Sequence, residues 1–296
     1  MLSLEEDLQL KKKSLSEFTT LSLRILNYLP NMQSTVEEKG DYKIFASKSA
    51  GTIKYLRPIN KKMFISDPDT FSRDVELFKK ILQKLKNKEK EYSIIEKKLI
   101  NSVLYTIQQS IGVGLDLLVD PNSGRKHAGN RFEELMKVVF TEIGILHKKI
   151  VLKIPYDIEE GKQKNYVCEN DIILTYDQSA LSKKDIDERE IVVSIKTSSK
   201  DRMGKMFMDK ILLEKFVGHN LKVIGIFLND VQRKKDNNIS FTLVSGLFMV
   251  YNKFLTSLEG VYYLDPPPNA IIFPYNNYIK PFSELVTKDI FSLLPS

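Results

Sequence analysis

Two charged residues interrupt or end apolar runs in the second half of the chain. Asp171 lies within residues 166–176, a stretch that is otherwise typical of a buried strand. Lys196 ends another apolar run, residues 191–196. A buried charge is costly unless it is paired or binds a metal. Each residue alone fits a structural ion pair or an edge-strand charge, but two on adjacent strands indicate a functional site.

A carboxylate and a lysine in this arrangement suit the hydrolysis of a phosphodiester bond. Asp171 would bind Mg²⁺ against the scissile phosphate, and Lys196 would orient the attacking water and offset the developing negative charge. Mg²⁺ prefers oxygen ligands and keeps several waters, so one or two further carboxylates are expected. Ser194, two residues before the lysine, has no charge to contribute. A further acid must therefore come from elsewhere in the chain.

Two other acids are candidates for this site. Asp209 lies seven residues after Arg202 on a predicted helix, so both side chains share a face that can turn toward the sheet. The alternative for Asp209 is an exposed ion pair with Lys205, one turn earlier. Glu133 lies on an earlier predicted helix, where it can orient metal-bound water. Its neighbour Glu134 is the alternative for that role.

Taken together, these residues resemble the catalytic domain of EcoRII-type restriction endonucleases and their CCGG-cutting relatives, within the PD-(D/E)xK superfamily. The resemblance covers residues from about 120 to 230, and its motifs are residues 125–133, Asp171, residues 194–196, residues 200–202 and Asp209. In that group a small residue replaces the acid before the lysine, and an acid on the following helix takes its place, as Ser194 and Asp209 would here. The chain departs from the group at Asn170, where the superfamily name has proline, and at Asp209, where relatives usually have Glu.

The resemblance implies a restriction-endonuclease-like mixed β-sheet flanked by helices, with Mg²⁺ as cofactor. It implies catalytic roles for Glu133, Asp171, Lys196 and Asp209; Asp171 and Asp209 would bind the metal, and Glu133 would do so through water. It also assigns DNA recognition to Lys200, Asp201 and Arg202, which would read a CC:GG step because Arg and Lys donate to guanine and an acid accepts from cytosine. A solvated helix N-terminus is the alternative for these three residues.

Arg125 and Lys126 are further candidates for DNA contact. The implied function is a type II restriction endonuclease that cuts double-stranded DNA at a short palindromic site. A palindrome implies a twofold-symmetric homodimer, and cutting implies a cognate DNA methyltransferase as a genetic partner. Two alternatives stay open: a structure-selective repair or junction nuclease of the same fold, and a sequence-specific DNA-binding protein without cleavage.

The elements that must position these residues follow from hydrophobic periodicity and turn residues. We expect a helix at 203–217 and strands at 150–154, 166–176, 190–196, 222–228 and 239–244. A turn-rich passage at 120–124 leads into a helix that runs through Phe132 and Val139. Helix, strands, helix and strand is typical of an α/β layer with a mixed sheet.

The first third of the chain is predicted to be mainly helical. Apolar residues recur at spacings of three and four within 71–85 and 95–107, and two short strands are expected at 42–46 and 52–56. We therefore divide the chain into an N-terminal region, 1–118, for dimerisation or DNA clamping, and a catalytic core, 119–296.

Composition sets outer limits on the function. A net charge of +7 suits a polyanionic partner, although many basic proteins bind no nucleic acid. A single cysteine excludes an intramolecular disulfide, and three scattered histidines give neither a zinc spacing nor a nucleophile motif. No apolar run approaches the roughly 20 residues of a membrane span, and the first residues do not read as a signal peptide. We expect a cytoplasmic protein with no membrane partner.

Overall fold

The computed structural model describes residues 2–32, 35–49, 52–159, 161–200 and 202–294. The chain begins with two helices and a three-stranded antiparallel sheet and continues with three long helices: α1 (Leu4–Gln9), α2 (Leu15–Met32), β1 (Thr35–Lys39), β2 (Tyr42–Ser49), β3 (Thr52–Asn60), α3 (Pro68–Lys86), α4 (Ile94–Leu118) and α5 (Pro121–Glu142). The two strands expected at 42–46 and 52–56 are confirmed. Strand β1 is additional, and periodicity does not predict it because its residues are exposed or half-buried.

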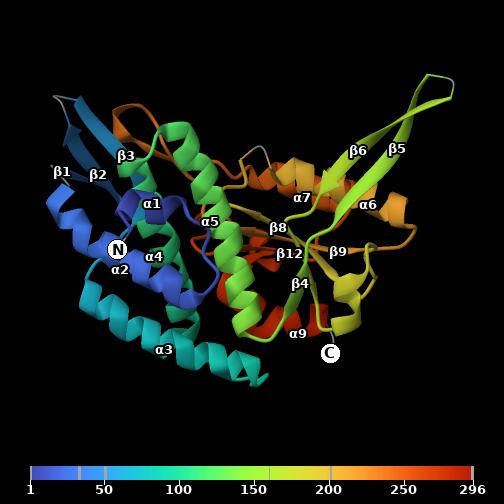
Figure 1. Cartoon of the computed structure of the whole chain (residues 1–296), viewed down its shortest axis with the longest axis horizontal. Coiled ribbons are helices and arrows are strands. Elements are labelled where there is room, and N and C mark those ends of the chain that lie inside the picture. The colour runs from blue at the N-terminus through green and yellow to red at the C-terminus, as the bar shows by residue number, and fades with distance from the viewer. Residues whose placement is uncertain (1, 33–34, 50–51, 160, 201, 295–296) are drawn as a thin grey trace.

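A six-stranded mixed sheet forms the centre of the molecule (Figure 1). Its strands, in sequence order, are β4 (Leu146–Lys148), β7 (Ile172–Thr175), β8 (Ile191–Lys196), β9 (Lys222–Phe227), β12 (Gly260–Tyr263) and β13 (Ile279–Pro281). The spatial order is β13-β12-β9-β8-β7-β4; β7 pairs antiparallel with β4 and β8, and the other pairs are parallel. Helix α6 (Met203–Val217) has the predicted bounds, and β8 and β9 match their predictions within a residue.

The alternation of side chains along β8 decides which layer faces the candidate site. Ile191, Val193 and Ile195 pack in the hydrophobic cluster that contains α4 and α5, whereas Val192 packs with Met206 of α6. Successive residues of a strand point to opposite faces. Ser194 and Lys196 therefore lie on the α6 face of the sheet.

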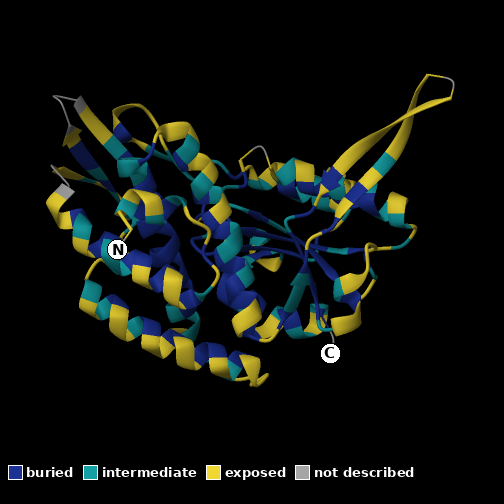
Figure 2. Cartoon of the chain, viewed as in Figure 1, coloured by how far each residue is buried: buried dark blue, intermediate teal, exposed yellow. Residues whose placement is uncertain are grey.

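The strand expected over 166–176 is wrong as a single element. Strand β6 (Lys162–Glu169) pairs with β5 (Val151–Glu159) in a separate two-stranded ribbon, whereas β7 joins the central sheet. The ribbon projects from the body of the molecule and is largely exposed (Figures 1 and 2). The break falls at Asn170 and Asp171, immediately beside the candidate site.

The passage at 120–124 is also corrected, because it is the first turn of α5 and not a loop. Asp120 is the N-cap, and its carboxylate accepts hydrogen bonds from the main-chain N–H groups of Asn122 and Ser123 at 3.1 and 3.0 Å. Pro121 occupies the first helical position, where its missing N–H costs nothing. Arg125 and Lys126 therefore lie within the second turn of a helix.

The remaining elements are short and follow α6, apart from η1: η1 (Gln178–Ser182), β10 (Val231–Arg233), η2 (Lys235–Asn237), β11 (Ile239–Phe241), α7 (Ser245–Phe254), η3 (Tyr275–Asn277), α8 (Phe282–Glu284), η4 (Leu285–Asp289) and α9 (Ile290–Leu293). Strand β11 is shorter than the predicted 239–244. The sequence patterns do not predict β12 or β13, since runs of three or four residues carry little periodicity.

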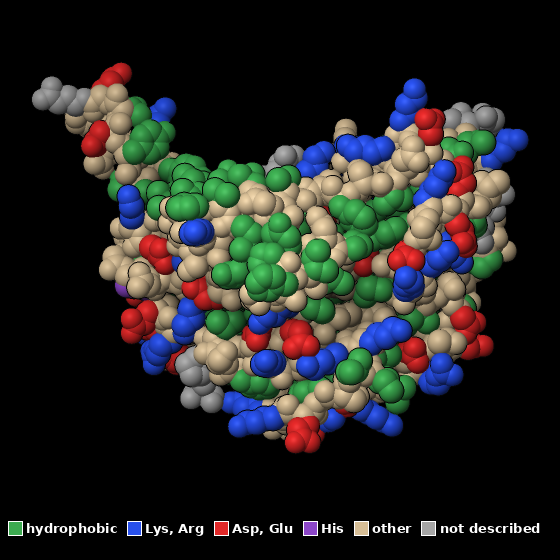
Figure 3. Space-filling model, turned by 180° about the vertical axis from the view of Figure 1, so that it is seen from behind, with side chains coloured by type: hydrophobic (Ala, Val, Ile, Leu, Met, Phe, Trp, Pro, Cys, Tyr) green, Lys and Arg blue, Asp and Glu red, His purple; other side chains and the backbone are tan. Residues whose placement is uncertain are grey.

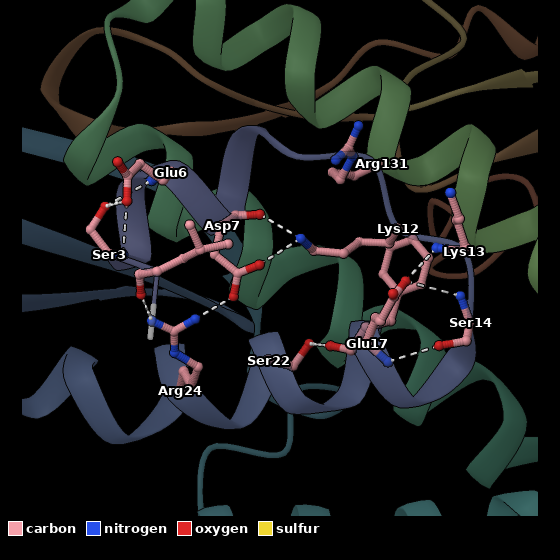
Figure 4. Close-up of polar contacts among 12 residues, drawn as sticks. Ser3, Glu6, Asp7, Lys12, Lys13, Ser14, Glu17, Ser22, Arg24 and Arg131 are labelled. Carbon is pink, nitrogen blue, oxygen red and sulfur yellow. Dashed lines mark hydrogen bonds and ion pairs between the residues drawn. The ribbon is translucent and has the colours of Figure 1, made fainter.

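The core consists of two hydrophobic clusters, one on each face of the central sheet. Helix α4 is buried all round from Ile100 to Leu115 and packs against α2, α3 and α5 (Figure 2). The Nζ of Lys12 donates to Asp7 at 2.6 Å (Figure 4). The main-chain N–H of Lys12 donates to Glu134 of α5 at 3.0 Å and so holds the N-terminus to this layer. None of the helices in the described ranges has the length and apolar character of a membrane span.

Candidate active site

Asp171 and Lys196 form an ion pair between neighbouring strands of the central sheet. The Lys196 Nζ donates to Asp171 Oδ1 at 2.8 Å and to Oδ2 at 2.6 Å, and the main-chain N–H of Ile195 donates to Oδ2 at 2.8 Å. The side chain of Asp171 is 18% exposed and that of Lys196 is 34% exposed. The pair is therefore fixed by the sheet and still open to solvent or a ligand.

This ion pair lines a cavity of 230 Å³ between the sheet and α6. The cavity gathers predicted residues from three segments of the chain: Asp171, Ser194, Lys196, Arg202 and Asp209. Glu169 also lines it and was not predicted. Glu169 is the last residue of β6 and precedes Asp171 by two residues, so its closeness to Asp171 in the sequence is the signal that could have identified it.

Asp209 shows both of the arrangements that the sequence left open. Its carboxylate accepts from Lys205 Nζ at 2.7 and 2.6 Å, which is the predicted i, i+4 pair, and it also lines the cavity. Burial alone would lower the pKa of Lys205, but the hydrogen bond and charge of Asp209 outweigh it and raise the pKa. Lys205 is therefore a firmly charged partner for Asp209.

The oxygen-rich lining of the cavity fits a hard divalent cation. Two carboxylates, from Asp171 and Asp209, and the hydroxyl of Ser194 face a common space. Within the part of the chain that the structure describes, no three His, Cys, Asp or Glu residues are grouped closely enough to hold a metal. Mg²⁺ commonly binds one or two carboxylates and completes its shell with water and substrate phosphate, so this donor set suits Mg²⁺ when a phosphate is present.

Glu133 and Glu134 lie on α5, which packs against the opposite face of the sheet. Glu133 forms an ion pair with Lys137 and is not among the residues lining the cavity. Glu134 accepts from the buried guanidinium of Arg131 at 2.9 Å. The structure thus does not bring Glu133 to Asp171, and its catalytic role stays a prediction.

The predicted recognition residues lie at the edge of this cavity. Arg202 is the N-cap residue of α6, is exposed and lines the cavity with Asp171. Lys200 is exposed and lines an adjoining cavity of 550 Å³ with Gln232 and Phe241. Asp201 lies outside the described residues. Arg202 therefore lies beside the candidate catalytic site, and Lys200 lies beside the β10–β11 hairpin.

Arg125 and Lys126 are exposed and lie apart from the Asp171 cavity. Arg125 lines a separate cavity of 310 Å³ together with Lys54 of β3 and Arg233 of β10. These three cations come from distant parts of the sequence, so tertiary structure alone brings them together. The cluster adds a second positively charged surface.

Asp230 is a further buried acid that sequence reasoning missed. It has no exposed surface and accepts from Ser199 Oγ at 2.5 Å and from Tyr263 OH at 2.7 Å. Its sequence signal is an acid three residues after the end of β9, comparable to Lys196, the charged residue that ends the apolar run of β8.

Comparison with known proteins gives a match in fold. No protein-family model matches the chain, and no curated protein matches it. The crystal structure of the Type IIP restriction endonuclease Kpn2I is similar, with a TM-score of 0.69 and 18% identity over 95% of this chain and 91% of that chain. A complex of restriction endonuclease PspGI with substrate DNA has a TM-score of 0.41 and 15% identity over 76% of this chain and 92% of that one. The likeness to Kpn2I confirms the predicted restriction-endonuclease-like α/β fold.

Proposed function

We propose that this chain is a Mg²⁺-dependent type II restriction endonuclease that hydrolyses phosphodiester bonds in double-stranded DNA. The observation that carries the proposal is the Asp171–Lys196 pair, placed by two neighbouring strands in a cavity that Asp209 and Arg202 also line. The restriction-endonuclease-like fold supports this reading of the pair.

In the proposed reaction Asp171 and Asp209 hold the cation, and the Ser194 hydroxyl is available as a further oxygen ligand. Bound Mg²⁺ would polarise the scissile phosphate and make a coordinated water more acidic. Lys196 would orient the attacking water and stabilise the negative charge that builds on phosphorus-bound oxygens. In this structure a lysine pairs with each of the two acids. Both ion pairs are partly exposed, so a cation could reach the carboxylates from solvent.

We assign base recognition to Lys200, Asp201 and Arg202, and propose a short palindromic site that contains a CC:GG element. Exposed Lys200 and Arg202 suit guanine O6 and N7 in the major groove. Lys and Arg side chains also lie along the right part of the upper edge between the two projections, beside a stretch of hydrophobic side chains (Figure 3). With a net charge of +7, this edge is a suitable surface for DNA phosphates.

A palindromic site requires two symmetric active sites, so we propose a homodimer in which each subunit cuts one strand. Such an enzyme acts in the cytoplasm on incoming DNA. It also requires a cognate methyltransferase that protects the host's own sites.

Digestion of an unmethylated plasmid, with Mg²⁺ and with EDTA, tests the proposal. Discrete Mg²⁺-dependent fragments whose ends share a palindrome with CC and GG are expected. Cutting confined to branched DNA, without fixed ends, would instead identify a structure-selective repair or junction nuclease.

A second candidate is a sequence-specific DNA-binding protein without cleavage. It is favoured by the pairing of Asp171 with Lys196 and of Asp209 with Lys205, which neutralises both candidate metal ligands. Sequence-specific gel shifts with no Mg²⁺-dependent cutting under any of these conditions would establish it.

A further inference from the structure

The segment that carries Lys200 and Arg202 follows directly from the catalytic strand. Strand β8 ends at Lys196, and the parallel ladder with β9 continues for two more hydrogen bonds, from Leu228 N–H to Lys196 C=O at 3.3 Å and from Asn229 N–H to Thr197 C=O at 3.4 Å. Ser198 and Ser199 follow these two bonds, and their contacts with the segment after β9 are made to the side chain of Asp230.

The carboxylate of Asp230 supports both serines. Its Oδ1 accepts from the main-chain N–H of Ser199 at 2.7 Å and from Ser198 Oγ at 3.0 Å, and its Oδ2 accepts from Ser199 Oγ at 2.5 Å. The side chain thus replaces the main-chain acceptor that a longer β9 would have provided. Both serines between the catalytic lysine and Lys200 are bound to one acid.

The same carboxylate is fixed from two other strands. Tyr263, at the end of β12, donates its hydroxyl to Oδ2 at 2.7 Å. Thr242, just after β11, donates its hydroxyl to Oδ1 at 3.1 Å, and its main-chain N–H donates to the Asp230 carbonyl at 2.8 Å. Burial, with the charge of Asp230 beside it, raises the pKa of Tyr263 well above its usual value, so the phenol stays a donor.

Burial of a carboxylate is unfavourable unless several donors form hydrogen bonds with it. Removal of one of these donors lowers the stability of the fold. Asp230 has no exposed surface, yet five donors from the 198–199 segment, Thr242 and Tyr263 surround it. None of the other acids beside the loop in the described ranges is buried in this way: Asp209 and Asp171 both reach solvent. The arrangement is therefore specific to the place where the recognition segment leaves the sheet.

We infer that Asp230 is a positioning residue, which holds Ser198 and Ser199 in a fixed place so that base recognition by Lys200 and Arg202 stays in register with Lys196. The inference rests on the proposed function, since it assigns the loop to DNA recognition. Positioning of this kind matters because a displacement of about 1 Å at a catalytic or recognition group can reduce a rate by roughly 100-fold.

The experiment compares wild type with Asp230→Asn, Ser199→Ala and Tyr263→Phe. Asp236→Asn is the matched control, since Asp236 is an exposed acid on the same β10–β11 hairpin. Two readouts are taken on each protein: the cutting rates of a plasmid site and of the same site with one base pair changed, and the amide hydrogen exchange of the peptide spanning 197–203.

We expect Asp230→Asn to reduce the ratio of cognate to altered-site cutting at least about tenfold and to accelerate exchange in 197–203 by a similar factor. Ser199→Ala and Tyr263→Phe each remove one donor and should give smaller changes of the same sign. They also keep the test decisive if Asp230→Asn fails to fold. The control should match wild type.

Unchanged discrimination and unchanged exchange in all three variants would overturn the inference. A uniform loss of cutting at both sites, with no change in exchange at 197–203, would do so too, because that is the result of a merely structural defect. If wild type cuts no DNA, the proposed function fails; hydrogen exchange still decides separately whether Asp230 holds the loop.

Discussion

At the level of single residues, the candidate site contains two acids that are each neutralised by a lysine. Asp171 is bound through both oxygens to Lys196, and Asp209 is bound through both oxygens to Lys205. A divalent cation competes with an ammonium group for the same oxygens. In the proposed reaction the two lysines would affect the site differently: Lys196 would act beside the scissile phosphate, whereas Lys205 would only compete for Asp209.

Removal of the central pair should abolish cutting without loss of DNA binding. We expect Asp171→Asn and Lys196→Ala each to reduce the cleavage rate by about 1,000-fold or more, since each removes a group that acts on the transition state. Single-turnover cleavage and gel shifts in Ca²⁺ measure the two properties. Lys184→Ala and Asp185→Asn, both exposed, are the matched controls. Full activity in both site variants would exclude this pair as the catalytic centre.

Asp209 and Lys205 should shift the Mg²⁺ requirement in opposite directions. We expect Asp209→Ala to raise the Mg²⁺ concentration for half-maximal cutting by about tenfold, because a ligand is lost, and Lys205→Ala to lower it, because a competitor is lost. Cleavage rates over a Mg²⁺ titration provide the measurement, with exposed Lys215→Ala of the same helix as control. Identical Mg²⁺ titration curves for Asp209→Ala and wild type would show that Asp209 is not a metal ligand.

At the level of elements, α6 has to be held over the sheet because it carries Arg202 and Asp209 toward the cavity. Lys210 of α6 is 4% exposed, and its Nζ donates to Glu259 at 2.8 and 3.1 Å and to the carbonyl of Ser257 at 2.7 Å. Glu259 directly precedes β12 and also accepts from Val223 N–H of β9 at 2.6 Å. One ion pair thus joins the helix to two central strands.

Removal of Glu259 alone should lower the free energy of unfolding more than replacement of both Lys210 and Glu259 by apolar residues. Glu259→Ala leaves the buried ammonium group of Lys210 with only the more distant carboxylate of Glu214, at 3.9 Å. We therefore expect a loss of about 2 kcal/mol in the free energy of unfolding, less than in the fully buried case because Glu259 is partly exposed. The double variant Lys210→Met, Glu259→Leu should recover part of that loss. Urea unfolding of the single and double variants measures both effects, with exposed Glu188→Ala as control. A double variant that unfolds as easily as Glu259→Ala, or more easily, would contradict this expectation.

At the level of the whole molecule, the N-terminal sheet is joined to the central sheet through a second buried acid. Asp265 follows β12, and its carboxylate accepts from Asn60 Nδ2 of β3 at 2.8 Å and from Tyr42 OH of β2 at 3.4 Å. Burial raises the pKa of Asp265 to about 6, although these hydrogen bonds oppose the shift. The contact between the two sheets therefore contains a carboxyl group that folding makes harder to ionise.

A raised carboxyl pKa makes the folded state bind the proton more tightly than the unfolded state does. The contribution of Asp265 to stability is thus complete below a pH of about 4 and is lost as the pH rises through about 6. We expect Asp265→Asn, which cannot ionise, to gain stability relative to wild type between pH 4 and pH 7 by up to about 3 kcal/mol. Urea unfolding at both values tests this, with exposed Asp185→Asn as control. Parallel pH profiles for wild type and Asp265→Asn would contradict it.

The division of the chain at residue 118 remains a prediction about this whole-molecule organisation. The first hydrophobic cluster contains Leu8 and Phe78 from the N-terminal region together with Ile195 and Ile290 from the rest of the chain. The basic cavity with Lys54 and Arg125 likewise draws on both regions. The N-terminal region therefore shares its hydrophobic core with the candidate catalytic core, and any role in DNA clamping or dimerisation would involve both.

The amino-acid sequence was enough to predict the mixed α/β fold, the bounds of α6 and the neighbourhood of Asp171 and Lys196. It did so because charge inside an apolar run is a local signal, and because a long helix repeats its pattern over several turns. The same local signals failed where elements are short, as for β12, and where two pairings meet inside one apolar run, as between β6 and β7.

Which acids share a cavity depends on how distant segments pack. Asp209 shares a cavity with Asp171 because α6 packs over this face of the sheet, and Glu169 shares it because β6 ends beside the cavity. Glu133 lies on a helix that packs on the other face. Asp230 is bound to serines more than thirty residues before it in the chain, so no spacing rule connects them. Contacts between distant segments depend on packing of the whole chain, and a local pattern of residues does not contain that information.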